Sequence, residues 1–170
     1  NNKLKEQEKR EVGAVKIASK QDPVAESMFL DIEKKIYNDD TLQILIETRP
    51  LDEDLIISYI LYNYFDGYWE KYNFQTTICK PADNLVFGDG EQVNCDTFFS
   101  DMISKSGHFT FSDNLFYLDN SPWFSSYIAR LPFKGDSLSP SFTIYIEMNA
   151  KFAPEGLVYP ELLIGENIQR

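Results

Sequence analysis

Residues 142–148, with the sequence Phe-Thr-Ile-Tyr-Ile-Glu-Met, carry the clearest strand pattern in the chain. Apolar side chains at every second position alternate with Thr143, Tyr145 and Glu147, and successive side chains of a strand point to opposite faces of a sheet. The pattern therefore predicts a strand with one face in the core. Residues 125–133 carry a second strand pattern, and a turn rich in Gly, Asp and Ser joins the two strands.

Three more segments upstream have strand character. The segment 108–118 places Phe109 and Phe111 on one face, then turns, then resumes as an apolar run, which predicts a hairpin. Residues 73–79 are dense in β-branched and aromatic side chains, and residues 85–87 form a short apolar run between turn residues. We expect about five strands, paired as an antiparallel sheet.

Helix signals dominate the first 67 residues. Residues 3–20 are rich in helix formers, and the Asp22-Pro23 pair is a helix-start signal, with Asp as the N-cap and Pro in the first turn. The helix that follows carries an apolar stripe at every fourth residue, formed by Val24, Met28, Ile32 and Ile36. We expect this stripe to pack in the core.

Three shorter helices are predicted from their end signals. Asp40 can cap a helix that runs through Glu47, and Asp52 begins another one. The side chains of this second helix that we expect to face inward are Leu55, Ile56, Tyr59, Ile60 and Tyr64. A third helix begins at Asn94 or Asp96 and ends at Gly107, which we expect to adopt the left-handed conformation that often closes a helix.

The order of these elements predicts an α+β fold, in which N-terminal helices pack against an antiparallel sheet. We divide the chain into a helical segment, residues 1–67, and a sheet domain, residues 68–170. With 170 residues in total, both parts form one domain.

Composition excludes several classes of protein. A hydrophobic fraction of 43% is far from that of a disordered chain, and no apolar run approaches the ~20 residues of a membrane span. The net charge is −11, from 16 basic and 27 acidic residues, which disfavours nucleic acid as a partner because nonspecific affinity for phosphates comes from Lys and Arg. The chain begins Asn1-Asn2 rather than with Met, so we expect it to be a piece of a longer protein.

Cys79 and Cys95 are the only cysteines, and the turn residues between them can bring two segments together. Either they form a disulfide, which would indicate an oxidising compartment, or they are two buried thiols. Two cysteines and one distant histidine do not complete a structural zinc site.

No catalytic motif is present. The single histidine, His108, follows a predicted helix end, and the chain lacks the G-x-S-x-G, H-E-x-x-H and phosphate-loop patterns. We therefore expect no enzyme activity and no cofactor in this chain. The rings of Tyr62, Tyr64, Tyr68, Trp69 and Tyr72 could line a sugar site, but core and rim packing explains them more simply.

The last third of the chain resembles a known family. The segments that carry the resemblance are 116–119, 126–133, 142–147 and 155–164, the last with the pattern G-x-x-Y-P-E-L-L, together with the cysteine pair. These segments resemble the extracytoplasmic PAS-like or Cache-like sensor domain of bacterial transmembrane histidine kinases, in two-component signal transduction. The resemblance covers about residues 70 to 165.

The resemblance implies a periplasmic domain of an inner-membrane protein, held between two membrane helices that lie outside this chain. It implies a homodimeric parent whose kinase part, which uses ATP, lies beyond Arg170. The signal would be a small molecule or a periplasmic protein. The alternative from a different class is a secreted or lipid-anchored module that binds carbohydrate or protein.

The resemblance also implies a ligand site against the sheet. We expect Arg130 to grip a carboxylate or phosphate there. The possible walls are Tyr117, Trp123, Tyr127 and Tyr145. The competing interpretation is a structural contact, in which Arg130 pairs with Glu147 across neighbouring strands.

Overall fold

The computed structural model describes residues 21–120 and 125–151, and this part of the chain has the predicted α+β fold. The helices are α2 (Pro23–Tyr37), α3 (Asp40–Glu47), α4 (Glu53–Tyr64), the 3-10 helix η1 (Gly67–Lys71) and α5 (Cys95–Ser106). The strands are β1 (Tyr72–Cys79), β2 (Asn84–Val86), β3 (Gln92–Asn94), β4 (Gly107–Phe109), β5 (Leu115–Leu118), β6 (Ser126–Phe133) and β7 (Phe142–Ala150). The predicted helix at residues 3–20 lies outside the described residues.

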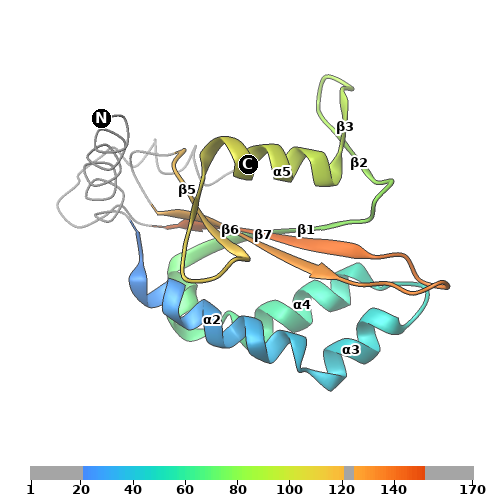
Figure 1. The fold of residues 1–170 in the computed structure, drawn as a ribbon, viewed down its shortest axis with the longest axis horizontal. Helices are drawn as coiled ribbons and strands as arrows, with labels where there is room; N and C mark the ends of the chain where they lie inside the picture. Colours follow the sequence, from blue (N-terminus) through green and yellow to red (C-terminus); the bar gives the residue numbers. More distant parts are fainter. Residues whose placement is uncertain (1–20, 121–124, 152–170) are drawn as a thin grey trace, which may run out of the picture.

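The described residues form three layers (Figure 1). The middle layer is a five-stranded antiparallel sheet in the order β1-β7-β6-β5-β4, while β2 and β3 form a separate two-stranded ribbon. Helices α2, α3 and α4 cover one face of the sheet, and α5 covers the other (Figure 1). A large apolar core lies under α2–α4, and a smaller one lies under α5.

Strand β7 is buried on both faces, so the expectation of a single core face is wrong. Ile144 and Ile146 belong to the core under α2–α4, whereas Tyr145 belongs to the core under α5. Glu147 is also buried. The sequence alternates because the second face of β7 carries polar side chains. That face is nevertheless buried, because α5 covers it (Figure 1).

Aspartates cap three of the helices. The side chains of Asp22, Asp39 and Asp52 each accept a hydrogen bond from the backbone N–H three residues further on. The cap of α3 is therefore Asp39 and not Asp40, which lies in the first turn. Both positions suit an acid, because the helix N-terminus favours negative charge, but only Asp39 has the extended backbone of a cap.

The buried faces of two helices differ from the expected stripes. Val24 is 53% exposed and Leu55 is 48% exposed, although both were expected inside. The buried apolar residues of α2 are Ala25, Phe29, Ile32 and Ile36. A strict repeat of four drifts around the helix axis because one turn takes about 3.6 residues, so the buried face needs a spacing of three as well.

Gly107 ends α5 in an extended conformation, with φ −85° and ψ 141°, and not in the expected left-handed one. The chain enters β4 directly at this residue. A Cβ atom at Gly107 would lie 2.5 Å from the carbonyl oxygen of Ile103. Close approach to the last turn of α5 therefore explains the glycine.

The structure joins Cys79 and Cys95 in a disulfide, with their Cα atoms 5.5 Å apart. Cys79 ends β1 and Cys95 begins α5, so the bond fastens the helix to the edge of the sheet. Both residues are buried in the smaller core, beside Phe99.

Candidate functional site

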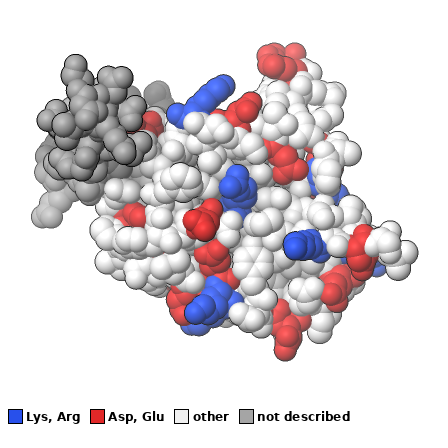
Figure 2. All heavy atoms as spheres, viewed as in Figure 1, with Lys and Arg blue, Asp and Glu red and all other residues white. Residues whose placement is uncertain are grey.

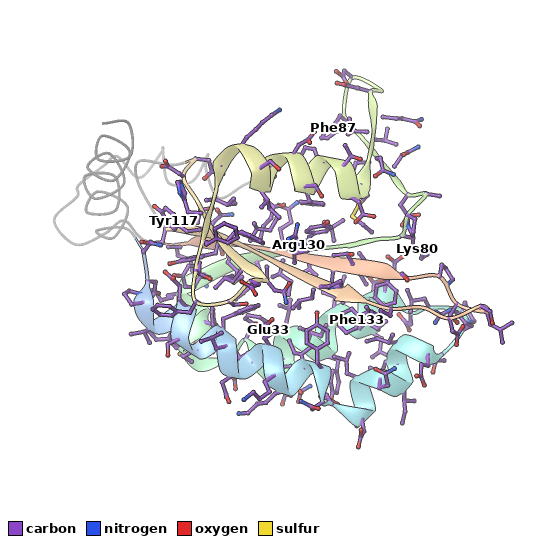
Figure 3. The ribbon with its side chains drawn as sticks, in the orientation of Figure 1. Glu33, Lys80, Phe87, Tyr117, Arg130 and Phe133 are labelled. Atoms are coloured by element: carbon purple, nitrogen blue, oxygen red, sulfur yellow. A yellow bond between two sulfur atoms is a disulfide. The ribbon has the colours of Figure 1, made fainter. Side chains whose placement is uncertain are left out.

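The described residues expected to form a ligand site lie in two pairs on opposite faces of the sheet. Tyr117 and Tyr127 belong to the core under α2–α4, while Arg130 lies in the same strand as Tyr127 but three residues further on, and so on the opposite face. Tyr145 belongs to the core under α5. Trp123 lies outside the described residues. Figure 3 shows Arg130 between the sheet and α5.

Arg130 makes a packing contact. Its guanidinium carbon lies 5.0 Å from the ring centre of Phe116, a cation–π geometry. Its direct neighbour on β7 is Tyr145, and Glu147 lies opposite Ile128. Arg130 and Glu147 are therefore diagonal neighbours on the same face of the sheet, and the expected contact between them stays a prediction.

Instead, the structure gathers polar side chains at the beginning of α2, around Asp22. Its carboxylate accepts hydrogen bonds from the hydroxyl groups of Tyr68 at 2.6 Å and Tyr72 at 2.7 Å, and from the ammonium group of Lys71 at 2.9 Å. Its backbone N–H donates to the hydroxyl oxygen of Tyr127 at 2.7 Å. The helix cap thus joins α2 to η1, β1 and β6.

These contacts decide the charge of Asp22. Burial alone would raise the pKa of the carboxyl group, but the hydrogen bonds from Tyr68, Lys71 and Tyr72 outweigh it and lower the pKa. The same carboxylate, together with burial, raises the pKa of the Tyr72 hydroxyl group. Asp22 is therefore ionised, and Lys71 balances its charge.

Glu26 lies one turn further along α2 and has a different environment. It is only 5% exposed, and its Oε2 atom accepts a hydrogen bond from the Tyr127 hydroxyl group at 2.8 Å. Burial and the nearby charge of Asp22 raise the pKa of Glu26 in spite of this hydrogen bond. No ion pair joins Glu26 to a basic side chain within residues 21–120 and 125–151.

Glu26 lines a cavity of about 330 Å³ between the beginning of α2 and the end of β4. This volume lies at the lower end of the range for small-molecule sites. The other lining residues are Gln21, Pro23, Phe109, Thr110 and Phe111. Phe109 is 80% exposed and Phe111 is 62% exposed, which is unusual for large apolar rings.

The loop after β4, which carries Phe111, is joined to α2 by hydrogen bonds to Glu33. Its two carboxylate oxygens accept hydrogen bonds from the hydroxyl group of Ser112 and the amide group of Asn114, both at 2.6 Å. Thr110 donates to the backbone oxygen of Leu115 at 2.7 Å, which closes the turn. Hydrogen bonds thus join the two elements that form the cavity (Glu33 is labelled in Figure 3).

The sequence pattern did not predict this site. Asp22 was interpreted only as a cap, and Phe109 and Phe111 as one face of a strand. One available signal was the position of Glu26, which lies three residues before Phe29 and therefore on the same face of the helix. A carboxylate on a buried helix face needs a partner or a ligand.

The tyrosines between α4 and β1 are mainly packing and hydrogen-bonding groups. Trp69 and Tyr72 are buried in the larger core. Tyr64 donates a hydrogen bond to Asp39, the cap of α3, while Tyr62 is exposed. They do not form the wall of one sugar site.

Charges are interspersed over the face of the molecule seen in Figure 2, where acidic and basic side chains alternate without a single basic patch. None of the helices in the described part of the chain is long and apolar enough to cross a membrane. The described residues also contain no group of three or more side chains placed to hold a metal ion.

Comparison of the chain with protein-family models, with curated proteins and with solved structures finds no match.

Proposed function

We propose that this chain is the extracytoplasmic input domain of a bacterial membrane sensor histidine kinase. In this role it converts the binding of a ligand or partner into a displacement of the segments that flank it. The domain itself carries out no chemistry, and the kinase part belongs to the parent chain beyond Arg170.

The observation that carries the proposal is that both ends of the described chain meet at Lys71. Its ammonium group pairs with Asp22, at the beginning of α2, at 2.9 Å. Its carbonyl oxygen accepts a hydrogen bond from the backbone N–H of Lys151, just after β7, at 2.8 Å. The incoming and outgoing chain therefore lie at the same end of the sheet (Figure 1), as a domain held between two membrane helices requires.

Two further features support the proposal. The disulfide between Cys79 and Cys95 suits an oxidising compartment such as the periplasm. The G-x-x-Y-P-E-L-L pattern at Gly156 to Leu163, although it lies outside the described residues, resembles the segment that precedes the second membrane helix in such kinases.

The cavity has the right position to influence the ends. One wall belongs to the first turn of α2, and the other belongs to the end of β4 and the loop that follows. A ligand that prefers one spacing of these walls would shift the population between two packings of α2 on the sheet. In a homodimeric parent, the displaced ends would change the relation between the two kinase parts.

The test uses the parent protein reconstituted in lipid vesicles with radiolabelled ATP. Asp22→Asn removes the charge that Lys71 balances and keeps the size of the side chain, so we expect the rate of autophosphorylation to change about fivefold or more. Asp31→Asn on the exposed face of α2 is the matched control and leaves the rate unchanged. Equal rates for Asp22→Asn and the wild type would refute the proposal.

The alternative, a secreted or lipid-anchored binding module, is distinguished by the parent reading frame. The sensor requires apolar runs of about twenty residues on both sides of this chain and a kinase part downstream. A lipoprotein signal upstream and a stop codon after Arg170 would instead support the binding module.

A further inference from the structure

We propose that the cavity beside α2 binds a small organic cation, an amine with an apolar body, and that Glu26 is its counter-ion. This inference deepens the proposed function by naming the class of ligand. It rests on the proposed function only for the effect of binding on the kinase, because the binding itself depends on the cavity alone.

The carboxylate of Glu26 has no balancing charge among the described residues. Asp22 has Lys71 as a basic partner, and Glu33 accepts hydrogen bonds at both carboxylate oxygens. Glu26 lacks both features. It is only 5% exposed, accepts one hydrogen bond, from Tyr127, and has no basic partner among the described residues. A buried carboxylate is costly unless it is paired, and a cation in the cavity would supply the missing partner.

The wall opposite Glu26 carries two aromatic rings. Phe109 and Phe111 expose most of their rings at the mouth of the cavity. The faces of aromatic rings attract cations and also bind apolar groups, so one ligand that has both parts satisfies the rings and Glu26 together. Among the described residues no basic side chain lines the cavity, which disfavours an anionic ligand.

A metal ion does not fit the same cavity. Of the described residues that line it, Glu26 is the only carboxylate, and the other oxygen-bearing side chains are those of Gln21 and Thr110. Calcium requires six to eight oxygen ligands, and magnesium needs near-octahedral geometry. An alkylammonium group needs only one carboxylate and a few further acceptors.

A short series of contacts would connect a bound amine to the ends of the described chain. Its N–H groups donate to the Glu26 carboxylate, and the Tyr127 hydroxyl group donates to the same carboxylate. The Tyr127 oxygen accepts the backbone N–H of Asp22, whose side chain pairs with Lys71. These contacts therefore connect the cavity to Lys71, the residue that contacts both ends of the described chain.

The test is isothermal titration calorimetry of the full 170-residue chain at pH 7.5. The probes are benzylamine, 2-phenylethylamine and n-hexylamine, with 2-phenylethanol and 3-phenylpropanoate as the neutral and anionic counterparts of 2-phenylethylamine. We expect at least one amine to bind with a Kd below about 1 mM, and about tenfold or more tightly than the alcohol. The anion is expected to give no binding heat.

Variants assign the binding to the cavity. Glu26→Gln keeps the size and the acceptor for Tyr127, and is expected to weaken amine binding about tenfold or more while leaving the alcohol unaffected. Phe109→Ala is expected to weaken it about threefold to tenfold. The matched controls are Glu70→Gln and Phe87→Ala, which lie away from the lining and leave the Kd unchanged.

Thermal unfolding followed by circular dichroism checks that each variant is folded. Absence of binding by all three amines would overturn the inference, as would equal affinity for the amine and the alcohol, or an unchanged Kd in Glu26→Gln. Each of these failures leaves the autophosphorylation test of Asp22→Asn untouched, because that test uses no ligand.

Discussion

Replacing Asp22 by alanine is the most informative test of how the fold is held together. The carboxylate joins α2 to the segment that includes η1 and the beginning of β1. The groups that lose their acceptor are the backbone N–H of Ala25, the hydroxyl groups of Tyr68 and Tyr72, and the ammonium group of Lys71. We expect the free energy of unfolding to fall by about 4 kcal/mol.

The magnitude follows from the exposure of each donor. Loss of the cap costs about 1 kcal/mol. The Tyr72 hydroxyl group is buried and would lose its acceptor, which costs about 1–3 kcal/mol of stability. The hydroxyl group of the more exposed Tyr68 can bind water instead, so its loss costs less. Lys71 is 43% exposed and can be solvated by water again, so its lost ion pair adds no more than about 1 kcal/mol.

The assay is urea unfolding followed by circular dichroism. Asp31→Ala is the control, because its pair with Lys35 is about two-thirds exposed and contributes no more than about 0.5 kcal/mol. Because the pKa of Asp22 is lowered in the folded state, the stability it contributes is complete above about pH 4, its ordinary range, and is lost as the pH falls through the lowered pKa. A loss below about 1.5 kcal/mol at pH 7, or a difference that does not shrink in acid, would refute this account.

Three further variants test other parts of the structure. Glu26→Gln removes a buried charge whose pKa is raised, so we expect it to be more stable than the wild type by about 1 kcal/mol at pH 7.5, in thermal unfolding. The stability of the wild type falls as the pH rises from 4.5 through the raised pKa, so this gain should vanish near pH 4, and a constant gain would contradict it. Cys79→Ala/Cys95→Ala opens the disulfide-closed loop and should cost about 3 kcal/mol in urea unfolding, whereas an unchanged midpoint would show that the bond adds no stability. Gly107→Ala drives a Cβ atom into a backbone oxygen of α5 and should cost about 2 kcal/mol, while Gly88→Ala, with open space around it, should stay within about 0.5 kcal/mol; equal melting temperatures would refute the steric explanation.

Local chemistry made much of the fold predictable. The start of α2 depends only on the side-chain oxygen of Asp22 and on the fixed φ of Pro23, and these two residues are adjacent in the sequence. Strands β6 and β7 were predictable because their side chains repeat with a period of two. The same period of two places Tyr127 and Arg130 on opposite faces of β6, which the sequence alone already indicates.

The missing part of the site depends on which elements become neighbours. Phe109 has the sequence pattern of a core residue, but it ends β4, which is an edge strand within the described part of the sheet. Glu26 has the appearance of a surface acid, but the hydroxyl group that binds it comes from β6, 101 residues later. No local signal reports either fact.

The sequence by itself determined the α+β class, most helix starts and most strand positions, because capping and side-chain alternation are short-range effects. Tertiary structure decided that both faces of β7 are covered, that Lys71 contacts both ends of the described chain, and that Glu26 faces two exposed phenylalanine rings across a cavity. These features arise from strand order and from the packing of layers, which depend on contacts between residues far apart in the chain.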